Sequence, residues 1–194
     1  AEVLRAAGIE RAMLIKGNAT RRLLYEAPEQ RPGRDVDILV SADEFRPALR
    51  ALKESGWEDA VLLPTVRAGG EDPYAWTFRR AFGEVSLECD VHQRLTLVPG
   101  YTLNLDRMLD QAQAHDNAPL PLALPEDLFL GGVLHMGKTG LDGPLKSWVD
   151  LLRLAGHPDV DLGRCAERAR TANMAAVTWA CLRMLDRLAR QQMG

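Results

Sequence analysis

The hydrophobic and polar positions of the chain change their spacing at about residue 122. Before this point, apolar strand-like segments alternate with helical ones, and the pattern predicts strands at 12–15, 35–40, 58–63, 74–81 and 84–92. The same region predicts helices at 2–7, 17–25 and 43–55. From Pro125 onward the spacing predicts helices at 125–137, 144–155, 161–172 and 174–191. A mixed sheet followed by helices is an α+β layout, so we expect an α+β core at 1–122 and a helical C-terminal region at 123–194.

The predicted strand at 12–15 runs directly into a helix through Lys16, Gly17 and Asn18. A helix that starts in this way has free backbone N–H groups and the positive end of its dipole at the junction, and both favour phosphate. Gly17 would let a phosphate approach the backbone, and Lys16 would add positive charge. An ordinary strand-to-helix turn capped by Asn18 explains the same residues, so this segment alone does not establish a phosphate site.

Two aspartates, Asp35 and Asp37, stand one residue apart at the start of the next predicted strand. Strand alternation places both on one face, where two unpaired like charges raise each other's pKa. Mg²⁺ would resolve this conflict, because it binds one or two carboxylates and completes its coordination with water and substrate phosphates. The pair indicates phosphate chemistry, although a solvated strand edge is an alternative. The same tripeptide recurs at Asp159-Val-Asp161, where the context predicts a helix start with a capping aspartate.

The segment 84–92 supplies a third acidic position. Its residues alternate strictly, with Glu88, Asp90 and His92 on one face and apolar residues on the other. Such a strand can place Asp90 beside Asp35 and Asp37. A half-buried strand with a solvated polar face is the alternative explanation of this pattern.

In their order along the chain, these segments resemble the uncharacterised bacterial nucleotidyltransferase family of the DNA polymerase β-like superfamily. The resemblance begins with Ile15-Lys16-Gly17, Arg31-Pro32 with Asp35-x-Asp37-Ile38-Leu39-Val40, and Glu88-x-Asp90-x-His92-x-Arg94-Leu95. It continues with Leu124-Pro-Glu-Asp-Leu-Phe-Leu130, His135, Lys138 and Leu145-Lys-Ser-Trp148-Val-Asp150-Leu, whose spacing differs from the family pattern by one residue.

The resemblance implies roles for individual residues. Asp35 and Asp37 would be the metal-binding pair, and Asp90 the third carboxylate. Gly17 and Asn18 would occupy the phosphate turn, with Asn18 in place of the serine of the superfamily. Lys16 and Lys138 would bind the nucleotide. The sequence leaves open the roles of Arg34, His92, His135 and Asp150; Asp150, in an otherwise apolar helix, is either paired or functional.

The reaction implied by the resemblance is nucleotidyl transfer. A nucleoside monophosphate, AMP from ATP or the equivalent from another NTP, would move to a hydroxyl group or similar nucleophile of an acceptor. Two Mg²⁺ ions would serve the attacking and leaving oxygens, and Asp90 would help to deprotonate the acceptor. The acceptor, which can be a small molecule, a peptide or RNA, is not encoded in any recognisable motif, and neither are the base preference and the oligomeric state.

Composition narrows the class of protein. The chain has 24 Lys and Arg residues against 27 Asp and Glu residues, a net charge of −3, which argues against general binding to the DNA backbone. It contains no stretch of 18 or more apolar residues, so we expect no membrane span. Three scattered cysteines, Cys89, Cys165 and Cys181, are interpreted as buried thiols of a cytoplasmic protein.

Three other functions fit parts of the sequence. A nucleotidyltransferase toxin that acts on RNA would need a large basic groove, for which the candidates are Arg21, Arg22, Arg79 and Arg80. A non-catalytic nucleotide-binding module would lack metal at the aspartate pair. A metal-dependent phosphohydrolase would use water in place of an acceptor.

Overall fold

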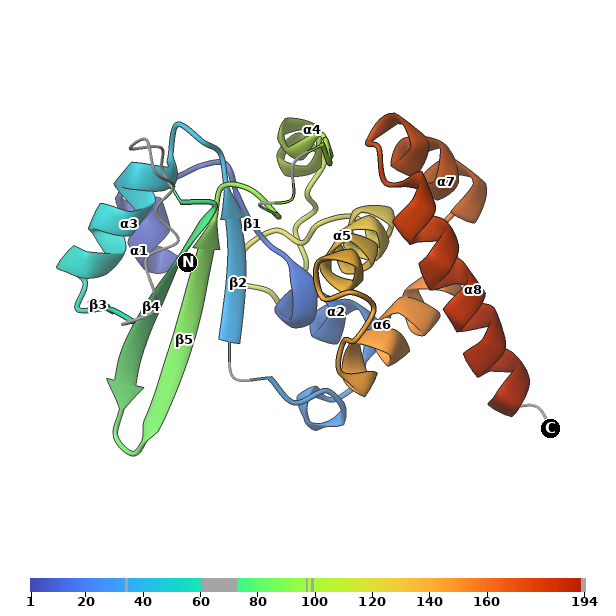
Figure 1. Cartoon of the computed structure of the whole chain (residues 1–194). Coiled ribbons are helices and arrows are strands. Elements are labelled where there is room, and N and C mark those ends of the chain that lie inside the picture. The colour runs from blue at the N-terminus through green and yellow to red at the C-terminus, as the bar shows by residue number, and fades with distance from the viewer. Residues whose placement is uncertain (34, 61–72, 97, 99, 193–194) are drawn as a thin grey trace.

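The computed structural model describes residues 1–33, 35–60, 73–96, 98 and 100–192. It has an α+β fold in which a five-stranded mixed sheet is followed by a helical C-terminal region, as the sequence predicts (Figure 1). Arg34 and the part of the predicted strand 58–63 beyond residue 60 lie outside the described residues.

The sheet has the strand order β1-β2-β5-β4-β3. Its strands are β1 (Ala12–Leu14), β2 (Asp35–Val40), β3 (Glu58–Asp59), β4 (Ala75–Phe82) and β5 (Val85–His92). β2 pairs in parallel with β5, and the other neighbours are antiparallel. β4 and β5 form a hairpin whose turn contains Gly83 at a φ of +62°, a conformation that glycine adopts without steric cost.

Helices lie on both sides of this sheet. α1 (Glu2–Ala6) contacts α3 (Phe45–Glu54) on one side, while α2 (Lys16–Leu24) packs beside β2 on the other (Figure 1). α3 buries Phe45, Ala48, Ala51 and Leu52 along one stripe. These three helices agree with the sequence prediction to within two residues at each end.

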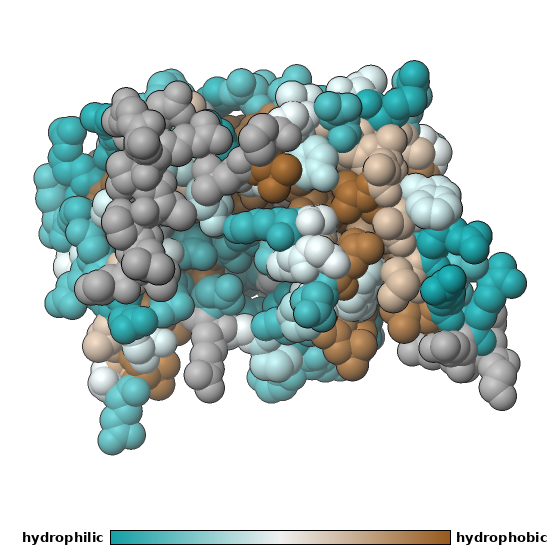
Figure 2. Space-filling view, viewed as in Figure 1, coloured by the Kyte–Doolittle hydropathy of each residue, from teal (hydrophilic) through white to brown (hydrophobic). Residues whose placement is uncertain are grey.

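The C-terminal region consists of α5 (Pro125–Lys138), α6 (Leu145–Ala155), α7 (Leu162–Thr171) and α8 (Ala175–Gln192), close to the four predicted helices. α5 is the central helix: it contacts α2, α6, α7 and α8. On the face shown in Figure 2, hydrophobic residues gather on the helical side of the molecule, next to α8. One hydrophobic core includes residues on both sides of position 122, such as Leu39 and Leu134.

Two short elements escaped the sequence prediction. α4 (Leu105–Asp110) is a single helix of six residues that starts at Asn104, whose side chain accepts a hydrogen bond from the backbone N–H of Arg107. A 3₁₀ turn occupies Pro28–Gln30. Both are too short to produce a clear hydrophobic period, which needs a window of about 11–18 residues.

Candidate active site

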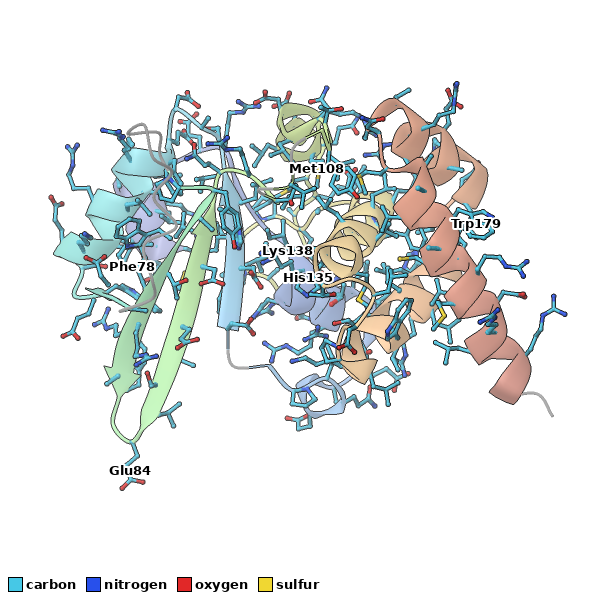
Figure 3. All side chains as sticks on the ribbon, viewed as in Figure 1. Phe78, Glu84, Met108, His135, Lys138 and Trp179 are labelled. Carbon is cyan, nitrogen blue, oxygen red and sulfur yellow. The ribbon has the colours of Figure 1, made fainter. Side chains whose placement is uncertain are left out.

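A cavity of about 540 Å³ lies where β2, β4 and β5 meet α2, α5 and α6. Its volume falls within the range of about 300–1,000 Å³ that is usual for small-molecule sites. Most of the residues predicted for the site line it: Lys16, Gly17, Asp35, Asp37, Asp90 and Lys138. Figure 3 shows His135 and Lys138 on the side of α5 that faces the sheet. Asn18 is not among the lining residues.

The register of β2 and β5 decides which carboxylates meet. Asp37 is the direct neighbour of Asp90 in the parallel pair, and His92 follows Asp90 on the same face. One ligand atom each from Asp37, Asp90 and His92 can be chosen so that all lie within 4.8 Å of one another. Asp35 lines the same cavity but is exposed and outside this group. The structure therefore brings Asp37 and Asp90 together, adds His92, and leaves Asp35 at the margin.

Asp37 is the most deeply buried of these acids, with only 3% of its surface exposed. Its Oδ1 lies 2.6 Å from Lys16 Nζ and 3.0 Å from His92 Nε2, and these two nitrogens are 3.1 Å apart. Burial alone would raise the pKa of Asp37, but the hydrogen bond with His92 and the charge of Lys16 outweigh it and hold the pKa below its ordinary value. Asp37 is therefore a carboxylate in the folded protein.

Asp90 is half-buried and oriented by a neighbour in the sheet. Thr77 Oγ1, on β4, donates a hydrogen bond of 2.6 Å to Asp90 Oδ1. Because Thr77 and Asp90 are register partners in the β4–β5 hairpin, the hairpin itself fixes this carboxylate. Neither Thr77 nor His92 was assigned a role from the sequence. The period-two pattern of the strand did place His92 on the same face as Asp90.

The junction between β1 and α2 has an unusual backbone at Lys16. This residue has a φ of +49°, in the left-handed region that costs a residue with a side chain roughly 1–2 kcal/mol. The conformation accompanies the contact of the Lys16 ammonium group with Asp37 and His92. The capping role considered for Asn18 is absent: the N-cap residue is Ile15, and Asn18 Oδ1 accepts a hydrogen bond from Arg22 Nε.

The guanidinium group of Arg31 lies directly against the backbone of Gly17. A Cβ atom added at Gly17 would lie 2.6 Å from Nη1 of Arg31, so any larger residue would collide with the guanidinium group. Arg31 is buried and holds Asp150 of α6 through Nε and Nη2, at 2.9 and 2.7 Å from Oδ2. Asp150 is thus paired. Like Thr77 and His92, Arg31 lines the cavity and was given no role from the sequence.

Asp150 also connects α6 to α2. Tyr25 donates a hydrogen bond of 2.8 Å to Asp150 Oδ1, and Thr20 donates a longer one to Oδ2. Burial, and then the hydrogen bond that Tyr25 donates to Asp150, raises the pKa of Tyr25 to about 12. A charged pair that is buried and fully hydrogen-bonded fixes the relative position of the elements that carry it. The pair between Arg31 and Asp150 therefore fixes the guanidinium group beside Gly17 in the wall of the cavity.

The C-terminal half of α5 contributes basic residues. Lys138 Nζ lies 3.0 Å from the hydroxyl oxygen of Tyr74 and 4.8 Å from the centre of its ring. His135, one turn earlier, is half-buried; burial, and then the charges of Lys16 and Lys138, hold its pKa below the ordinary value. His135 is therefore neutral at pH 7.

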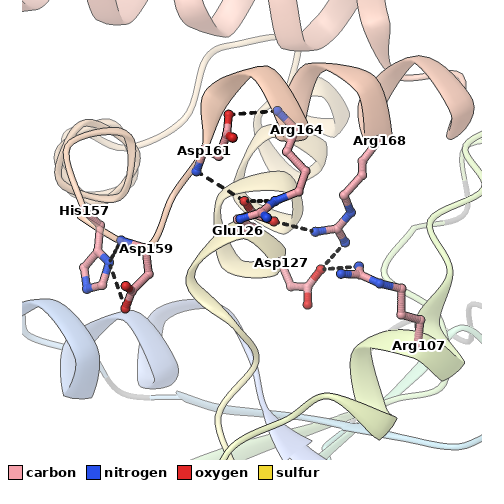
Figure 4. Close-up of polar contacts among 8 residues, drawn as sticks. All are labelled: Arg107, Glu126, Asp127, His157, Asp159, Asp161, Arg164 and Arg168. Atoms are coloured by element: carbon pink, nitrogen blue, oxygen red, sulfur yellow. Dashed lines mark hydrogen bonds and ion pairs between the residues drawn. The ribbon is translucent and has the colours of Figure 1, made fainter.

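A second polar cluster holds the N-terminal end of α5 (Figure 4). Glu126 pairs with Arg164 and Arg168, and Asp127 pairs with Arg168 and Arg107, so that α5 is tied to α7 and α4. Asp161 caps α7 by accepting a hydrogen bond from the backbone N–H of Arg164, as the sequence predicts. In this cluster, Asp127 is the residue that lines the cavity.

The model of the family described as "Uncharacterised nucleotidyltransferase" matches residues 1–190. The chain belongs to this family. The resemblance expected from the sequence motifs is thereby confirmed. None of the curated proteins compared with the chain matches it.

Solved structures show the same fold at low sequence identity. The antibiotic-resistance factor ANT(2'')-Ia, in complex with adenylyl-2''-tobramycin, is 13% identical with a TM-score of 0.54, covering 89% of this chain and 94% of its own. The lincosamide antibiotic adenylyltransferase LnuA, with lincomycin bound, is 15% identical with a TM-score of 0.53, covering 79% and 90%. An antigenic nucleotidyltransferase-like protein from Paracoccidioides brasiliensis is 21% identical with a TM-score of 0.51, covering 91% and 83%. The chain therefore shares the fold of these solved structures.

The remaining expectations concern the environment of the chain. Among the described residues, no helix combines the length and the apolar character that crossing a membrane requires. The three cysteines are free and buried, as the sequence indicated. The chain is thus a member of a nucleotidyltransferase family, and its cavity holds the group formed by Asp37, Asp90 and His92.

Proposed function

We propose that this protein transfers AMP from ATP to a hydroxyl group or similar nucleophile of a small acceptor molecule, with a divalent cation at Asp37, Asp90 and His92. The observation that carries the proposal is the convergence of these three residues, from two neighbouring strands, in a cavity that also contains lysines. A carboxylate pair beside basic residues suits a triphosphate, which needs charge neutralised both at the reacting phosphorus and along its tail.

The residues present fit a divalent cation. Two carboxylates and an imidazole within 4.8 Å offer oxygen and nitrogen ligands to one ion, and Mg²⁺ completes such sites with water and phosphate oxygens. Mn²⁺ also accepts this mixture of ligands and can report on the same site. When bound, the cation supplies charge neutralisation at the transferred phosphate. Asp35, at the margin of the cavity, is the position where a second Mg²⁺ would gain a protein ligand.

Lys16 lies between the proposed cation ligands and the turn at Gly17 that is proposed to bind the nucleotide. Its ammonium group contacts Oδ1 of Asp37 and Nε2 of His92, atoms of two of the three residues proposed to hold the cation. A cation can bind these atoms only after Lys16 moves, and the phosphates of ATP are the partners to which Lys16 would move. We therefore assign Lys16 to the nucleotide, together with Gly17 and Asn18 at the start of α2. Because Arg31 covers Gly17, phosphate would bind at the rim of this turn rather than against Gly17 itself.

Lys138 and Lys146 line the part of the cavity formed by the end of α5 and the start of α6. There they can offset the charge of the pyrophosphate that leaves. Asp90, held by Thr77, would accept the proton of the acceptor hydroxyl. Neutral His135 lines the cavity one turn before Lys138 on α5 and can donate or accept a hydrogen bond.

The RNA-directed alternative has less support. Arg79 forms an ion pair with Glu88, and Arg80 donates a hydrogen bond to the backbone oxygen of Ser55. These two arginines of β4 are therefore occupied within the protein. The cavity has the size of a small-molecule site, and this favours a small acceptor over RNA.

Labelled ATP tests the proposal directly. The protein is incubated with a cell lysate, Mg²⁺ and ATP labelled at either the α or the γ phosphorus. We expect the α label to appear on an acceptor with release of pyrophosphate, and this transfer to be lost in Asp37→Asn. Glu88→Gln is the matched control, because it removes one charge from β5 outside the cavity. Transfer of the γ label alone would indicate a kinase, and release of inorganic phosphate without a labelled acceptor would indicate a phosphohydrolase.

A further inference from the structure

Asp150 uses only one side of the Arg31 guanidinium group. Within the described part of the chain, the hydrogen bonds of Arg31 come from Nε and Nη2, and all of them go to Asp150. Nη1, which carries two N–H groups, has no acceptor among these residues. The side chain is only 9% exposed, yet Nη1 is not one of the fully buried polar atoms that lack a partner. Nη1 therefore has accessible surface and two unused donors.

The accessible part of Arg31 belongs to the wall of the cavity. Arg31 lines the cavity, and so does Gly17, where an added Cβ would lie 2.6 Å from Nη1. The other side of the guanidinium group is occupied by Asp150 of α6. Gly17 thus leaves room for an arginine at the place where the sequence predicted a phosphate against the backbone. The donors of Arg31 lie beside the first turn of α2 instead.

The first turn of α2 adds donors next to this arginine. The helix starts after Ile15 without a side-chain cap, and its first turn contains no acidic residue. In the described part of the chain, the first N–H group of α2 with a backbone acceptor is that of Ala19, which donates to Ile15. The N–H groups before it, together with the positive end of the helix dipole, favour an anion.

The start of α6 contributes polar groups to the same part of the cavity. Lys146 and Ser147 stand four and three residues before Asp150, so they share its face of α6, and both line the cavity. The carboxylate of Asp150 itself is occupied by Arg31 and by the hydroxyl group of Tyr25. The groups left for a ligand here can all donate hydrogen bonds. Such a set suits a phosphate, whose oxygens accept several charge-assisted hydrogen bonds.

We propose that Nη1 of Arg31 binds the terminal phosphates of the nucleotide at the rim of the turn formed by Gly17. That the anion is the tail of a nucleotide rests on the proposed function, whereas a polyphosphate site at Arg31 does not require transfer. Asp150 is the positioning residue, because a planar guanidinium group that is held on one side keeps its other donors in a fixed direction. Arg31 thereby joins Lys16 and Lys138 as a residue that binds the nucleotide.

The variant Arg31→Lys tests this assignment. A lysine ammonium group can still pair with Asp150, but it has no second arm to extend toward Gly17. Calorimetry with Mg²⁺ present measures the binding of three probes: ATP, inorganic tripolyphosphate and AMP. We expect the affinities for ATP and tripolyphosphate to fall about tenfold, as for the loss of a hydrogen bond to a charged group. The affinity for AMP, which lacks the terminal phosphates, should change less than about twofold.

Arg11→Lys is the matched control, because Arg11 also pairs with aspartates but does not line the cavity. It should leave the affinities for all three probes unchanged. If Arg31→Lys does not fold, the crystal structure of the parent protein with ATP and Mg²⁺ decides. A terminal phosphate oxygen should then lie within about 3 Å of Nη1.

Three results would overturn the proposal: unchanged ATP affinity in the folded Arg31→Lys protein, an equal loss of affinity for AMP and ATP, or terminal phosphates that bind away from Nη1. An equal loss would mean that the pair with Asp150 supports the cavity without touching the phosphates. These measurements need no acceptor and no turnover. Absence of α-label transfer would therefore contradict the proposed function and leave this site intact, while transfer with unchanged ATP binding in Arg31→Lys would do the reverse.

Discussion

The tripeptide Asp-Val-Asp occurs twice in the chain, and the two copies have different roles. On β2, Asp37 is buried against Lys16 and His92, and its register partner is Asp90. At the start of α7, Asp161 is exposed, and its side chain accepts a hydrogen bond from the backbone N–H of Arg164 in its own helix. The same tripeptide thus supplies a helix cap at Asp161, whereas at Asp37 it supplies a buried carboxylate that contacts Lys16 and His92. The difference comes from neighbours distant in sequence: Lys16 and His92 are 21 and 55 residues away from Asp37.

The largest expected effect comes from making the same substitution in both copies. Asp37→Asn should lower the rate of α-label transfer by about 100-fold or more, because under the proposed function it removes a charged group that would contact the reacting phosphate or its cation. It should also abolish the strengthening of ATP binding by Mg²⁺, measured by calorimetry. Asp161→Asn should change neither quantity, since asparagine caps a helix as well as aspartate does. Unchanged Mg²⁺-dependent ATP affinity in Asp37→Asn would contradict the assignment of the site.

This comparison also shows what sequence patterns can establish. Alternation along a strand was enough to place Asp90 and His92 on one face of β5, and the motif order pointed to the family. The pairing of Asp37 with Asp90 needs the register between two strands about 50 residues apart in sequence, and a shift of one residue would turn Asp90 to the other face.

Contacts between side chains that are distant in sequence could not be predicted from the sequence either. Arg31 and Asp150 are separated by 119 residues, and nothing local marks them as partners. The position of Lys16 on Asp37 depends on a left-handed backbone conformation that a lysine rarely adopts. The sequence could therefore identify residue types suited to the site, whereas tertiary packing decides which of them meet.

The second largest effect is expected from changing Lys16, the basic residue that contacts Asp37 on β2. The Asp161 copy has no contact with this lysine among the described residues. Lys16→Met keeps the length of the side chain and removes the ammonium group that occupies Asp37 and His92. Without nucleotide, Mn²⁺ should bind about tenfold more tightly to this variant, because no internal cation competes for the ligands. Titration followed by electron paramagnetic resonance of free Mn²⁺ measures this affinity.

The same variant should lose thermal stability in the absence of metal and recover it when Mn²⁺ is added, since among the described residues the buried Asp37 otherwise keeps only His92 as a partner. ATP affinity without metal should decrease. Arg11 pairs with Asp106 and Asp110 at the surface, and Arg11→Met is a control that should leave Mn²⁺ binding unchanged. Equal or weaker Mn²⁺ binding by Lys16→Met would show that its ammonium group does not compete with the metal.

A smaller difference in Mg²⁺-dependent ATP affinity is expected between substitutions of the first aspartate of each copy, Asp35 and Asp159. Asp35 is exposed at the margin of the cavity, and Asp159 is exposed before α7. If Asp35 completes the site when nucleotide binds, Asp35→Asn should reduce the gain in ATP affinity caused by Mg²⁺ by about threefold to tenfold. Asp159→Asn should have no effect on it. An effect of Asp35→Asn as small as that of Asp159→Asn would remove Asp35 from the ligand set and leave a site built on Asp37, Asp90 and His92.

Removing the cap of α7 should affect stability alone. Asp161→Ala deletes the oxygen that accepts the backbone N–H of Arg164, and the melting temperature should fall by about 2–4 °C. Asp161→Asn should keep most of the stability. Both variants should transfer the α label at the rate of the parent protein once the temperature is low enough for all to be folded. If Asp161→Ala transferred the α label more slowly than the parent protein at a temperature where both are folded, the cap of α7 would influence the active site as well as stability.

The smallest effect is the pH dependence of that cap. The hydrogen bond from the backbone N–H of Arg164 is the main reason why the pKa of Asp161 lies below its ordinary value. A carboxylate whose pKa is lower in the folded than in the unfolded protein stabilises fully above the unfolded pKa, about 3.9, and loses this contribution as the pH falls through the folded value. Asp161→Asn has no such charge. The difference in melting temperature between the parent protein and Asp161→Asn should therefore be constant from pH 7 to pH 5 and shrink below about pH 4. A difference that stays constant down to pH 3 would show that the negative charge of Asp161 contributes nothing to the α7 cap, and that its oxygen acts only as a neutral hydrogen-bond acceptor.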